Sequence, residues 1–327
     1  MADLLVVGSA DNDTLAGYTG NDTLVGLAGA DVLNGDAGTD RVDYSGSSAA
    51  VTVNLATGTG TGGDANGDSL SAIESLDGSV YSDLLIGDAA ANTLLGGNGD
   101  DTIIGGGGAD MLIGGAGIDT ADYSASAMSV TVNLATGLGT GGDSQGDVLD
   151  DIEVVIGTAG NDGFIGTDGA NTLYGEGGND AFMGGGGADV IHGGSGIDTA
   201  DYSRSSAGVS VNLALGTGLG GDAAGDVLTA IEIVTGSMHA DLLIGASGNS
   251  TLHGGGGDDT LNGSAGNTMM DGGNGNDTYL VNAGDQVVEN APGGEDTIIT
   301  GASYTLGLYV ENLVLTGDGW ISGTGNF

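Results

Sequence analysis

The sequence predicts an all-β fold, a right-handed parallel β-roll or β-solenoid, from three observations. A nine-residue pattern, Gly-Gly-x-Gly-x-Asp-x-(large apolar)-x, recurs without slippage. The glycines that open the last nonapeptide of each run, Gly35, Gly114, Gly193 and Gly272, lie 79 residues apart. The large apolar residue keeps one fixed place in the pattern. Fixed periods of this kind are typical of solenoids, in which each repeat buries its apolar face against the next.

Each nonapeptide divides into a turn and a strand. Its first six positions are Gly-rich, which suits a tight turn that visits positive φ and brings backbone carbonyls close to a ligand. Its last three positions predict a short strand with one inward side chain. Two nonapeptides then close one coil, with a parallel strand on each face. We count nineteen nonapeptides in four runs, which open at Gly8, Gly17, Gly26 and Gly35; Gly78, Gly87, Gly96, Gly105 and Gly114; Gly157, Gly166, Gly175, Gly184 and Gly193; and Gly236, Gly245, Gly254, Gly263 and Gly272.

The inward positions predict a thin core. One core residue in nine agrees with an aromatic content of only 4%. The residues expected inside are Leu15, Leu24, Leu33, Leu85, Leu94, Ile103, Leu112, Leu173, Ile191, Leu243, Leu252 and Leu261, with the bulkier Phe164, Phe182, Met270 and Tyr279.

The 34-residue segments between the runs, here called spacers, also repeat. The stretches 51–55, 130–134 and 209–213 alternate apolar and polar residues, as strands do. Each is followed by Gly-Asp-x-x-Gly-Asp and then by Ile-Glu. Because 34 residues are close to two 18-residue coils, we expect the spacers to form wider coils of the same solenoid. Separate flexible linkers are the alternative.

These boundaries divide the sequence into a partial first run, three super-repeats and a tail. The tail contains Trp320 and the only proline, Pro292, and is expected to form a cap or a joint. The ranges are 1–43 for the partial run; 44–122, 123–201 and 202–280 for the super-repeats, each a spacer plus a run; and 281–327 for the tail.

Composition excludes several classes of partner. The chain has 72 Gly, no Cys and 45 acidic residues against two basic ones, Arg41 and Arg204, for a formal charge of −43. Nucleic acid and anionic membranes need basic surface and are therefore excluded as partners. No apolar run reaches the ~18 residues that suggest a membrane span. The N-terminus lacks a basic region followed by an apolar one, so we expect no cleavable signal peptide.

The sixth position of the nonapeptide indicates a metal. Calcium takes carboxylate and carbonyl oxygens in forgiving geometry, whereas magnesium keeps its waters and demands a tight octahedron. A single Asp in such a turn is more simply an Asx-turn, but one fixed register favours calcium. The aspartates concerned, in fifteen of the nineteen turns, are Asp13, Asp22, Asp31, Asp40, Asp83, Asp101, Asp110, Asp119, Asp162, Asp180, Asp189, Asp198, Asp241, Asp259 and Asp277.

The nonapeptides resemble the repeat-in-toxin (RTX) repeats that form the parallel β-roll. The spacers and the tail, with Asn276-Asp277-Thr278-Tyr279 and Val310-Glu311-Asn312-Leu313, are also RTX-like. The resemblance implies that each calcium ion lies between turns n and n+2 and shares both Asp residues. It also implies a bacterial protein that a type I machine secretes through an uncleaved C-terminal signal, and that folds outside the cell or on its surface.

The exceptions at the sixth position refine the metal prediction. Asn92 and Asn171 leave half-charged sites, and the Ser250/Thr268 pair is expected to bind calcium weakly or not at all. Pairing within runs gives eleven possible sites, so we expect about ten or more calcium ions. The spacer pairs Asp64/Asp68, Asp143/Asp147 and Asp222/Asp226 either add sites or are polar turn residues.

No catalytic motif interrupts the repeats, and we expect no enzyme. The sequence has no His-Glu-x-x-His, no Gly-x-Ser-x-Gly and no Cys. His192, His239 and His253 lie in repeat turns without a partner arrangement. Tyr44, Tyr123 and Tyr202 recur at 79-residue spacing next to Asp43, Asp122 and Asp201, and packing where runs meet spacers explains them better than chemistry.

Two classes of function remain. The first is a non-enzymatic extracellular calcium-binding structural protein, a surface-layer, fibre or matrix component that folds on calcium. It would associate with itself into fibres or sheets, or with cell-surface polysaccharide. The second is a binding and secretion module of a larger secreted enzyme or adhesin. Met1 favours a complete small protein and the end at Phe327 favours a truncated one. A glycan- or ice-binding face of Thr14, Thr23, Thr93 and Thr102 is less favoured, because this ladder is patchy.

Overall fold

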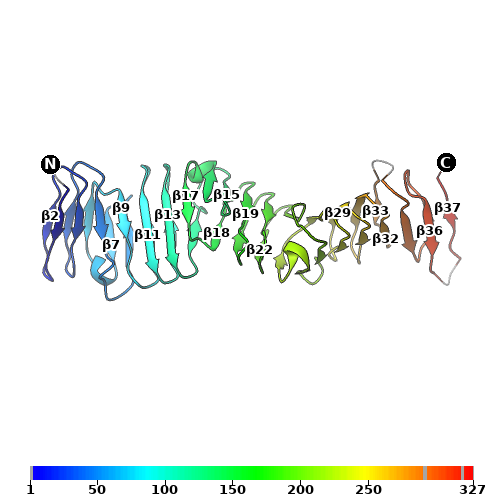
Figure 1. Cartoon of the computed structure of the whole chain (residues 1–327), viewed down its shortest axis with the longest axis horizontal. Helices are drawn as coiled ribbons and strands as arrows, with labels where there is room; N and C mark the ends of the chain where they lie inside the picture. Colours follow the sequence, from blue (N-terminus) through cyan, green and yellow to red (C-terminus); the bar gives the residue numbers. More distant parts are fainter. Residues whose placement is uncertain (1–2, 290–292, 318–319, 327) are drawn as a thin grey trace. The chain divides into compact units, whose positions relative to one another are not determined.

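The computed structural model describes residues 3–289, 293–317 and 320–326, so Met1, Pro292 and Phe327 lie outside the described residues. The chain divides into two compact units, Met1–Asp162 and Gly163–Phe327 (Figure 1). The boundary between them falls inside the third nonapeptide run. The division of the sequence into 79-residue super-repeats stays a prediction.

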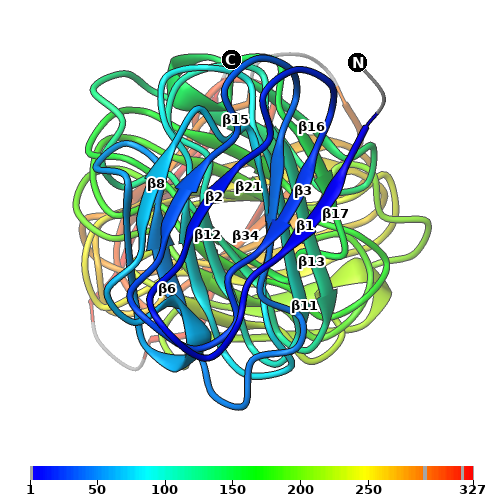
Figure 2. The ribbon, with the colours of Figure 1, turned by 90° about the vertical axis from the view of Figure 1, so that its left-hand side faces the viewer.

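Unit 1 consists of two facing sheets of short strands. Figure 2 looks along this unit from its first strands and shows β2, β6, β8 and β12 on one side and β1, β3, β11 and β13 on the other. In order of pairing, the first sheet contains β1 (Leu5–Val7), β3 (Thr23–Val25), β5 (Arg41–Asp43), β9 (Ser75–Asp77), β11 (Thr93–Asn98), β13 (Met111–Ala116), β17 (Val148–Asp150), β16 (Leu138–Thr140) and β15 (Thr131–Asn133). The second contains β2 (Thr14–Ala16), β4 (Val32–Asn34), β8 (Ser69–Ser71), β7 (Thr59–Thr61), β6 (Thr52–Asn54), β10 (Leu84–Ile86), β12 (Thr102–Ile104), β14 (Thr120–Asp122) and β18 (Val154–Ile156).

Consecutive nonapeptides contribute strands to opposite sheets, and strands 18 residues apart pair in parallel. Leu85 of β10 lies opposite Ile103 of β12, and Leu94 of β11 lies opposite Leu112 of β13. The side chains of these four residues point inward and have no exposed surface. Every residue predicted at an inward position is buried, so the predicted core is confirmed.

The spacers belong to the sheets but do not form two wider coils. In the first spacer, β9 continues the parallel sheet between β5 and β11. The remaining strands, β6, β7 and β8, form an antiparallel meander in the other sheet, between β4 and β10. Gly58, with φ of 64°, turns β6 into β7, and a 3-10 turn, η1 (Gly63–Ala65), leads towards β8. The two connections, residues 55–58 and 62–68, are too short for a parallel crossover, and their left-handed glycines let the chain reverse.

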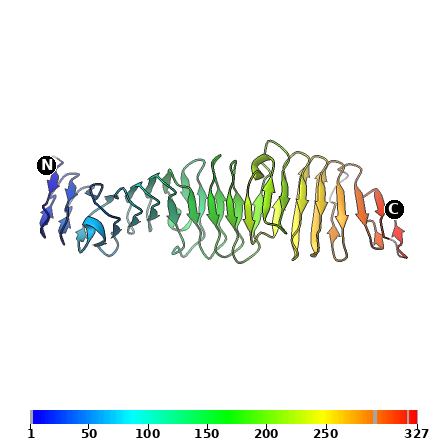
Figure 3. The same ribbon diagram turned by 90° about the horizontal axis from the view of Figure 1, so that it is seen from below.

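Unit 2 repeats this architecture. Successive strands, drawn green to yellow in Figure 3, lie side by side. One sheet contains β19 (Gly163–Ile165), β21 (Ala181–Met183), β23 (Thr199–Asp201), β27 (Ile233–Thr235), β29 (Ser250–Gly256), β31 (Thr268–Asn274) and β33 (Gln286–Val287). The other contains β20 (Thr172–Tyr174), β22 (Val190–His192), β26 (Val227–Thr229), β25 (Thr217–Leu219), β24 (Ser210–Asn212), β28 (Leu242–Ile244), β30 (Thr260–Asn262), β32 (Thr278–Val281), β34 (Thr297–Thr300) and β36 (Asn312–Leu315).

The tail extends the second of these sheets. β34 pairs in parallel with β32, and β36 pairs in parallel with β34. Two short strands, β35 (Tyr304–Thr305) and β37 (Gly323–Thr324), pair with each other, and Trp320 is fully exposed. Among the described residues, no helix has the length and apolar character needed to cross a membrane.

Candidate metal centre

The sixth-position aspartates form buried columns along the edges of the sheets. In unit 1 the backbone N–H of Asp83 donates to Oδ1 of Asp101 (2.7 Å), and that of Asp101 donates to Oδ1 of Asp119 (2.8 Å). In unit 2 the N–H of Asp259 donates in the same way to Oδ1 of Asp277 (2.8 Å). The fold therefore brings together the aspartates of turns n and n+2.

The second carboxylate oxygen of these aspartates is the unusual feature. In most of them it is buried and accepts no hydrogen bond, although buried polar atoms are nearly always paired. A hydrogen bond to a backbone N–H holds the carboxylate in place through Oδ1, so Oδ2 is presented to whatever else occupies the turn. The aspartates with such an Oδ2 include Asp22, Asp31, Asp40, Asp101, Asp110, Asp119, Asp189, Asp198, Asp259 and Asp277. The first aspartate of each run is different, because its Oδ2 accepts from a backbone N–H; these residues are Asp13, Asp83, Asp162 and Asp241.

The first glycine of each nonapeptide shows what Oδ2 faces. A β-carbon at Gly17 would lie 2.6 Å from Oδ2 of Asp22 and 2.7 Å from the carbonyl oxygen of Gly35, two turns further on. A β-carbon at Gly8 would lie 2.9 Å from Oδ2 of Asp13 and 2.7 Å from the carbonyl oxygen of Gly26. Glycine thus leaves a space where a carboxylate and a carbonyl oxygen converge.

This donor set fits calcium. Calcium takes 6–8 oxygen ligands at about 2.3–2.6 Å, from carboxylates and backbone carbonyls alike. An orphaned carboxylate oxygen beside a carbonyl oxygen is costly without a cation, because both carry negative charge. The nonapeptide aspartates and the glycine carbonyls are the groups that would hold the ion.

Each column within a run ends on an acidic residue of the following spacer. The N–H of Asp31 donates to Oδ1 of Asp68 (2.8 Å), and the N–H of Asp40 donates to Oε2 of Glu74 (2.8 Å). The later spacers repeat both contacts with Asp147 and Glu153, and with Asp226 and Glu232. The spacer acids thus occupy the positions that a further nonapeptide would fill.

The two aspartates of each predicted spacer pair lie in different parts of the structure. Asp68 lies at the end of a column, whereas Asp64 lies in the 3-10 turn η1, where its N–H donates to Oγ of Ser47 (3.0 Å). Tyr44 is buried and donates its hydroxyl to Oδ2 of Asp68 (2.9 Å), and Tyr123 and Tyr202 do the same for Asp147 and Asp226. The tyrosine hydroxyls thus donate to the second oxygen of the terminal carboxylate, where each run meets its spacer.

Several acids of these columns were not predicted from the sequence to be metal ligands. Glu74, Glu153 and Glu232 were visible only as a recurring Ile-Glu pair. In the tail, Asp296 continues the column, since the N–H of Asp277 donates to its Oδ1 (2.8 Å). A signal existed, because Asp296-Thr297-Ile298-Ile299 repeats the Asp101-Thr102-Ile103-Ile104 of a nonapeptide. Asp285, which accepts from the N–H of Thr268 (3.0 Å), had no such signal.

The exceptions also have a structural account. Asn92 keeps the column contact, because its N–H donates to Oδ1 of Asp110 (2.8 Å), but it brings no charge. At the Ser250/Thr268 pair, the Thr268 hydroxyl donates to the carbonyl oxygen of Gly263 (2.8 Å). A hydroxyl hydrogen bond thus occupies a carbonyl oxygen of this turn, and the weak binding of calcium at this pair stays a prediction.

The protonation of the columns reflects their burial. Desolvation, followed by repulsion from neighbouring carboxylates, raises the pKa of Asp101, Asp110 and Asp189 to about 7 and that of Asp259 to about 8. Hydrogen bonds from backbone N–H groups oppose these shifts without cancelling them. Without a bound cation, these four carboxyl groups would hold protons near neutral pH.

Comparison with known families agrees with this chemistry. The model of the RTX calcium-binding nonapeptide repeat matches residues 7–42, 86–121, 149–180, 165–200 and 235–270. The chain carries several copies of the RTX calcium-binding nonapeptide repeat. None of the curated proteins compared with it matches. The matched residues carry most of the aspartate columns, so this RTX chain is a calcium-binding repeat protein with the β-roll fold of such repeats.

Removing one column carboxylate is expected to weaken calcium binding. In Asp101→Asn, the amide oxygen still accepts from the Asp83 N–H, but the charged Oδ2 is lost. We expect at least about tenfold weaker binding at the adjoining sites, because ligand charge tunes calcium affinity. Isothermal titration calorimetry measures this.

The neighbouring residue provides the matched control. Asp100 is partly exposed, and its Oδ1 accepts from the N–H of Ile118 (2.9 Å), a contact that asparagine makes elsewhere in the chain. Asp100→Asn removes the same charge outside the column and is expected to leave calcium affinity nearly unchanged. Equal losses in the two variants would contradict the column assignment.

Protonation of the column carboxylates at low pH is expected to stabilise the calcium-free fold in part. The folded-state pKa values lie above the unfolded value of about 3.9, so the stability that protonation gives the ion-free fold is present at low pH and is lost as the pH rises through about 7–8. Circular dichroism in EGTA should show more β-structure at pH 5 than at pH 8. With calcium present, the calcium concentration at the folding midpoint should instead rise at pH 5, because protons compete for the same oxygens. Less β-structure at pH 5 in EGTA would contradict this assignment.

Proposed function

We propose that this chain is a non-enzymatic, extracellular structural protein whose folding depends on calcium. The observation that carries the proposal is the set of buried carboxylate oxygens without a counter-charge. The sequence supplies only two basic residues to balance 45 acidic ones, and Arg41 already pairs with Asp77 (2.9 Å). A bound cation is therefore the available source of positive charge for the columns.

The thin core supports the same dependence. Most strands bury a single side chain, while 72 glycines must be ordered. Fixing the backbone of one residue costs roughly 1–2 kcal/mol, and glycine loses the most freedom. Calcium binding would then supply free energy of folding, as in metal domains that are unfolded without their ion.

An extracellular site of action follows from this dependence. Calcium is scarce in the cytosol and abundant outside cells, so the chain would stay unfolded before export and fold afterwards. We propose type I secretion through an uncleaved C-terminal signal, in keeping with the RTX repeats.

A non-enzymatic role agrees with the surroundings of the histidines. His192 stacks on Tyr174, with ring centroids 4.7 Å apart, and Nδ1 of His253 lies 3.9 Å from Oδ2 of Asp271. Both residues lie on regular strands of the roll. We infer that they stabilise the surface of the strands.

Self-association is supported by apolar side chains on neighbouring strands. Met111 of β13 pairs with Val148 of β17, which also pairs with Leu138 of β16. The three residues are 42%, 39% and 52% exposed. Apolar surface of this kind favours contact with another protein surface. We propose that calcium-loaded chains associate with one another, while a binding module of a larger secreted protein is the second candidate.

Calcium titration tests the folding proposal. Far-UV circular dichroism is expected to show a disordered chain in EGTA at neutral pH and a β spectrum at about 1–10 mM calcium. Magnesium at the same concentration is the control and should restore much less structure. A full β spectrum in EGTA at pH 7.5 would overturn the proposal.

Size-exclusion chromatography with light scattering tests self-association. We expect a concentration-dependent increase in mass in calcium but not in EGTA. The variant Met111→Ser/Leu138→Ser should shift this equilibrium towards monomer without changing the calcium-dependent β spectrum. A stable monomer in calcium would favour the binding-module candidate.

A further inference from the structure

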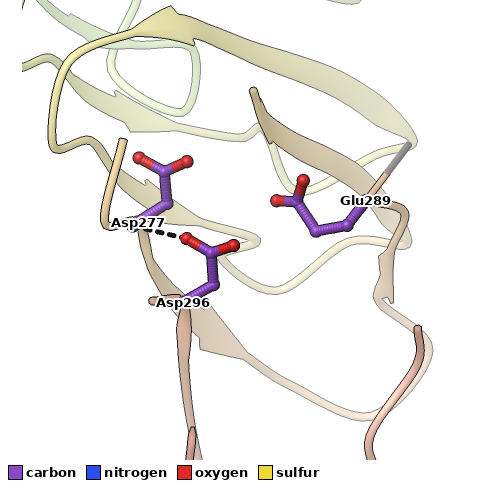
Figure 4. Close-up of side chains that lie close together, drawn as sticks. All are labelled: Asp277, Glu289 and Asp296. Carbon is purple, nitrogen blue, oxygen red and sulfur yellow. Dashed lines mark hydrogen bonds between the residues drawn. The ribbon is translucent and has the colours of Figure 1, made fainter. Parts of the chain in front are cut away.

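At the end of the column that contains Asp277 and Asp296, the carboxylate of a third residue, Glu289, lies close to those of the other two. Asp277 ends the turn of the last nonapeptide, Asp296 precedes β34, and Glu289 follows β33. Figure 4 shows the Glu289 carboxylate directed towards the carboxylates of Asp277 and Asp296. One oxygen from each residue lies within 4.8 Å of the others, and all three side chains are buried.

The turn of this last nonapeptide differs from the preceding ones. In earlier turns the N–H of the first glycine donates to a backbone carbonyl, as Gly236 does to His253 (2.7 Å). At Gly272 the N–H donates instead to the hydroxyl of Tyr279 (2.7 Å), which in turn contacts Oε1 of Glu289. A phenol and a carboxylate thus replace the backbone groups found at this place in the run.

Two oxygens of the cluster are orphaned. Oδ2 of Asp277 and Oδ2 of Asp296 are buried and accept no hydrogen bond, and the two residues are 1% and 0% exposed. Their Oδ1 atoms are held by the N–H groups of Asp259 and Asp277, both at 2.8 Å. The fixed carboxylates therefore present their free oxygens beside a third carboxylate, with no basic residue among these contacts.

We propose that Glu289 adds a third carboxylate to the last pair of this column, so that Asp277, Glu289 and Asp296 together form a calcium site that differs from the two-aspartate sites of the repeats. Three carboxylates give this site one more negative charge than a site shared by two aspartates. Calcium suits it better than magnesium, because the donors come from three separate segments and calcium tolerates irregular oxygen geometry. The proposal relies on calcium binding by the repeats only for the choice of ion, and it uses neither the structural role nor the secretion proposed above.

This site binds calcium more tightly than the repeat sites and joins the tail to the last nonapeptide run. Ligand charge count is a main determinant of calcium affinity. An ion among the three residues would link β32, which follows Asp277, to β34, which follows Asp296, and both to Glu289, which follows β33 of the opposite sheet. The tail strands thereby become ordered at a lower calcium concentration than the repeats.

Calcium counting in the full chain tests the site. Bound calcium is measured by equilibrium dialysis over a range of free calcium in the wild type, Glu289→Gln and Glu295→Gln. Glutamine keeps an oxygen that accepts from Tyr279 but removes the charge. We expect Glu289→Gln to lose the tightest site, with at least about tenfold weaker binding of one ion per chain, while the repeat sites remain. Glu295 is exposed, so Glu295→Gln should match the wild type.

Hydrogen exchange of the wild type gives a readout that needs no variant. Peptides covering 297–300 should gain protection at lower free calcium than peptides covering 102–104. Identical binding curves for Glu289→Gln and wild type, or tail protection that appears only together with that of the repeats, would overturn the site. A chain that binds no calcium at all would instead overturn the calcium assignment of the repeats.

Discussion

Buried carboxylate oxygens that face backbone carbonyl oxygens are the constraint on which the rest of this structure depends. Column aspartates such as Asp101 are held through Oδ1 by the N–H of an earlier turn, which fixes Oδ2 against the glycine of the same turn as the aspartate. In a medium of low effective dielectric such an arrangement is repulsive, and only a proton or a cation relieves it. On this basis we propose that calcium is part of the fold, in the same sense that a disulfide or a structural zinc is part of a small domain.

The glycines follow from the same constraint. A β-carbon at Gly17 would occupy the space between Oδ2 of Asp22 and the Gly35 carbonyl oxygen, so any other residue would block the ion. The third glycine of the pattern has a different reason. Gly99, with φ of 109°, adopts a backbone conformation that side chains disfavour, and a β-carbon there would meet the backbone of Tyr81. The repeat thus combines ion access with close stacking of turns.

Much of the fold and of the aspartate columns could be predicted from the sequence, because a fixed separation between residues in the sequence corresponds to a fixed separation in the structure. An 18-residue separation places Leu85 against Ile103 and Asp83 against Asp101, so strand register, core and columns follow from counting. The residues at which the columns end could not be predicted by counting along the sequence. Asp31 and Asp68 are 37 residues apart and Asp40 and Glu74 are 34 apart, because the meander adds chain without adding a regular coil. Its reversals depend on glycine φ angles, which no periodicity of apolar residues reveals.

The spacers have a further role in coupling neighbouring runs. In unit 1, Glu153 of the second spacer accepts from the N–H of Asp119 and so closes the preceding column. In the same spacer, the N–H of Val130 donates to Oδ1 of Asp162 (2.7 Å), the first aspartate of the next run. One spacer therefore completes the set of donors in the preceding run and positions the first carboxylate of the following run. An ion bound in one run orders a segment that the next run needs, so that calcium binding and folding are expected to be cooperative along the columns of each unit.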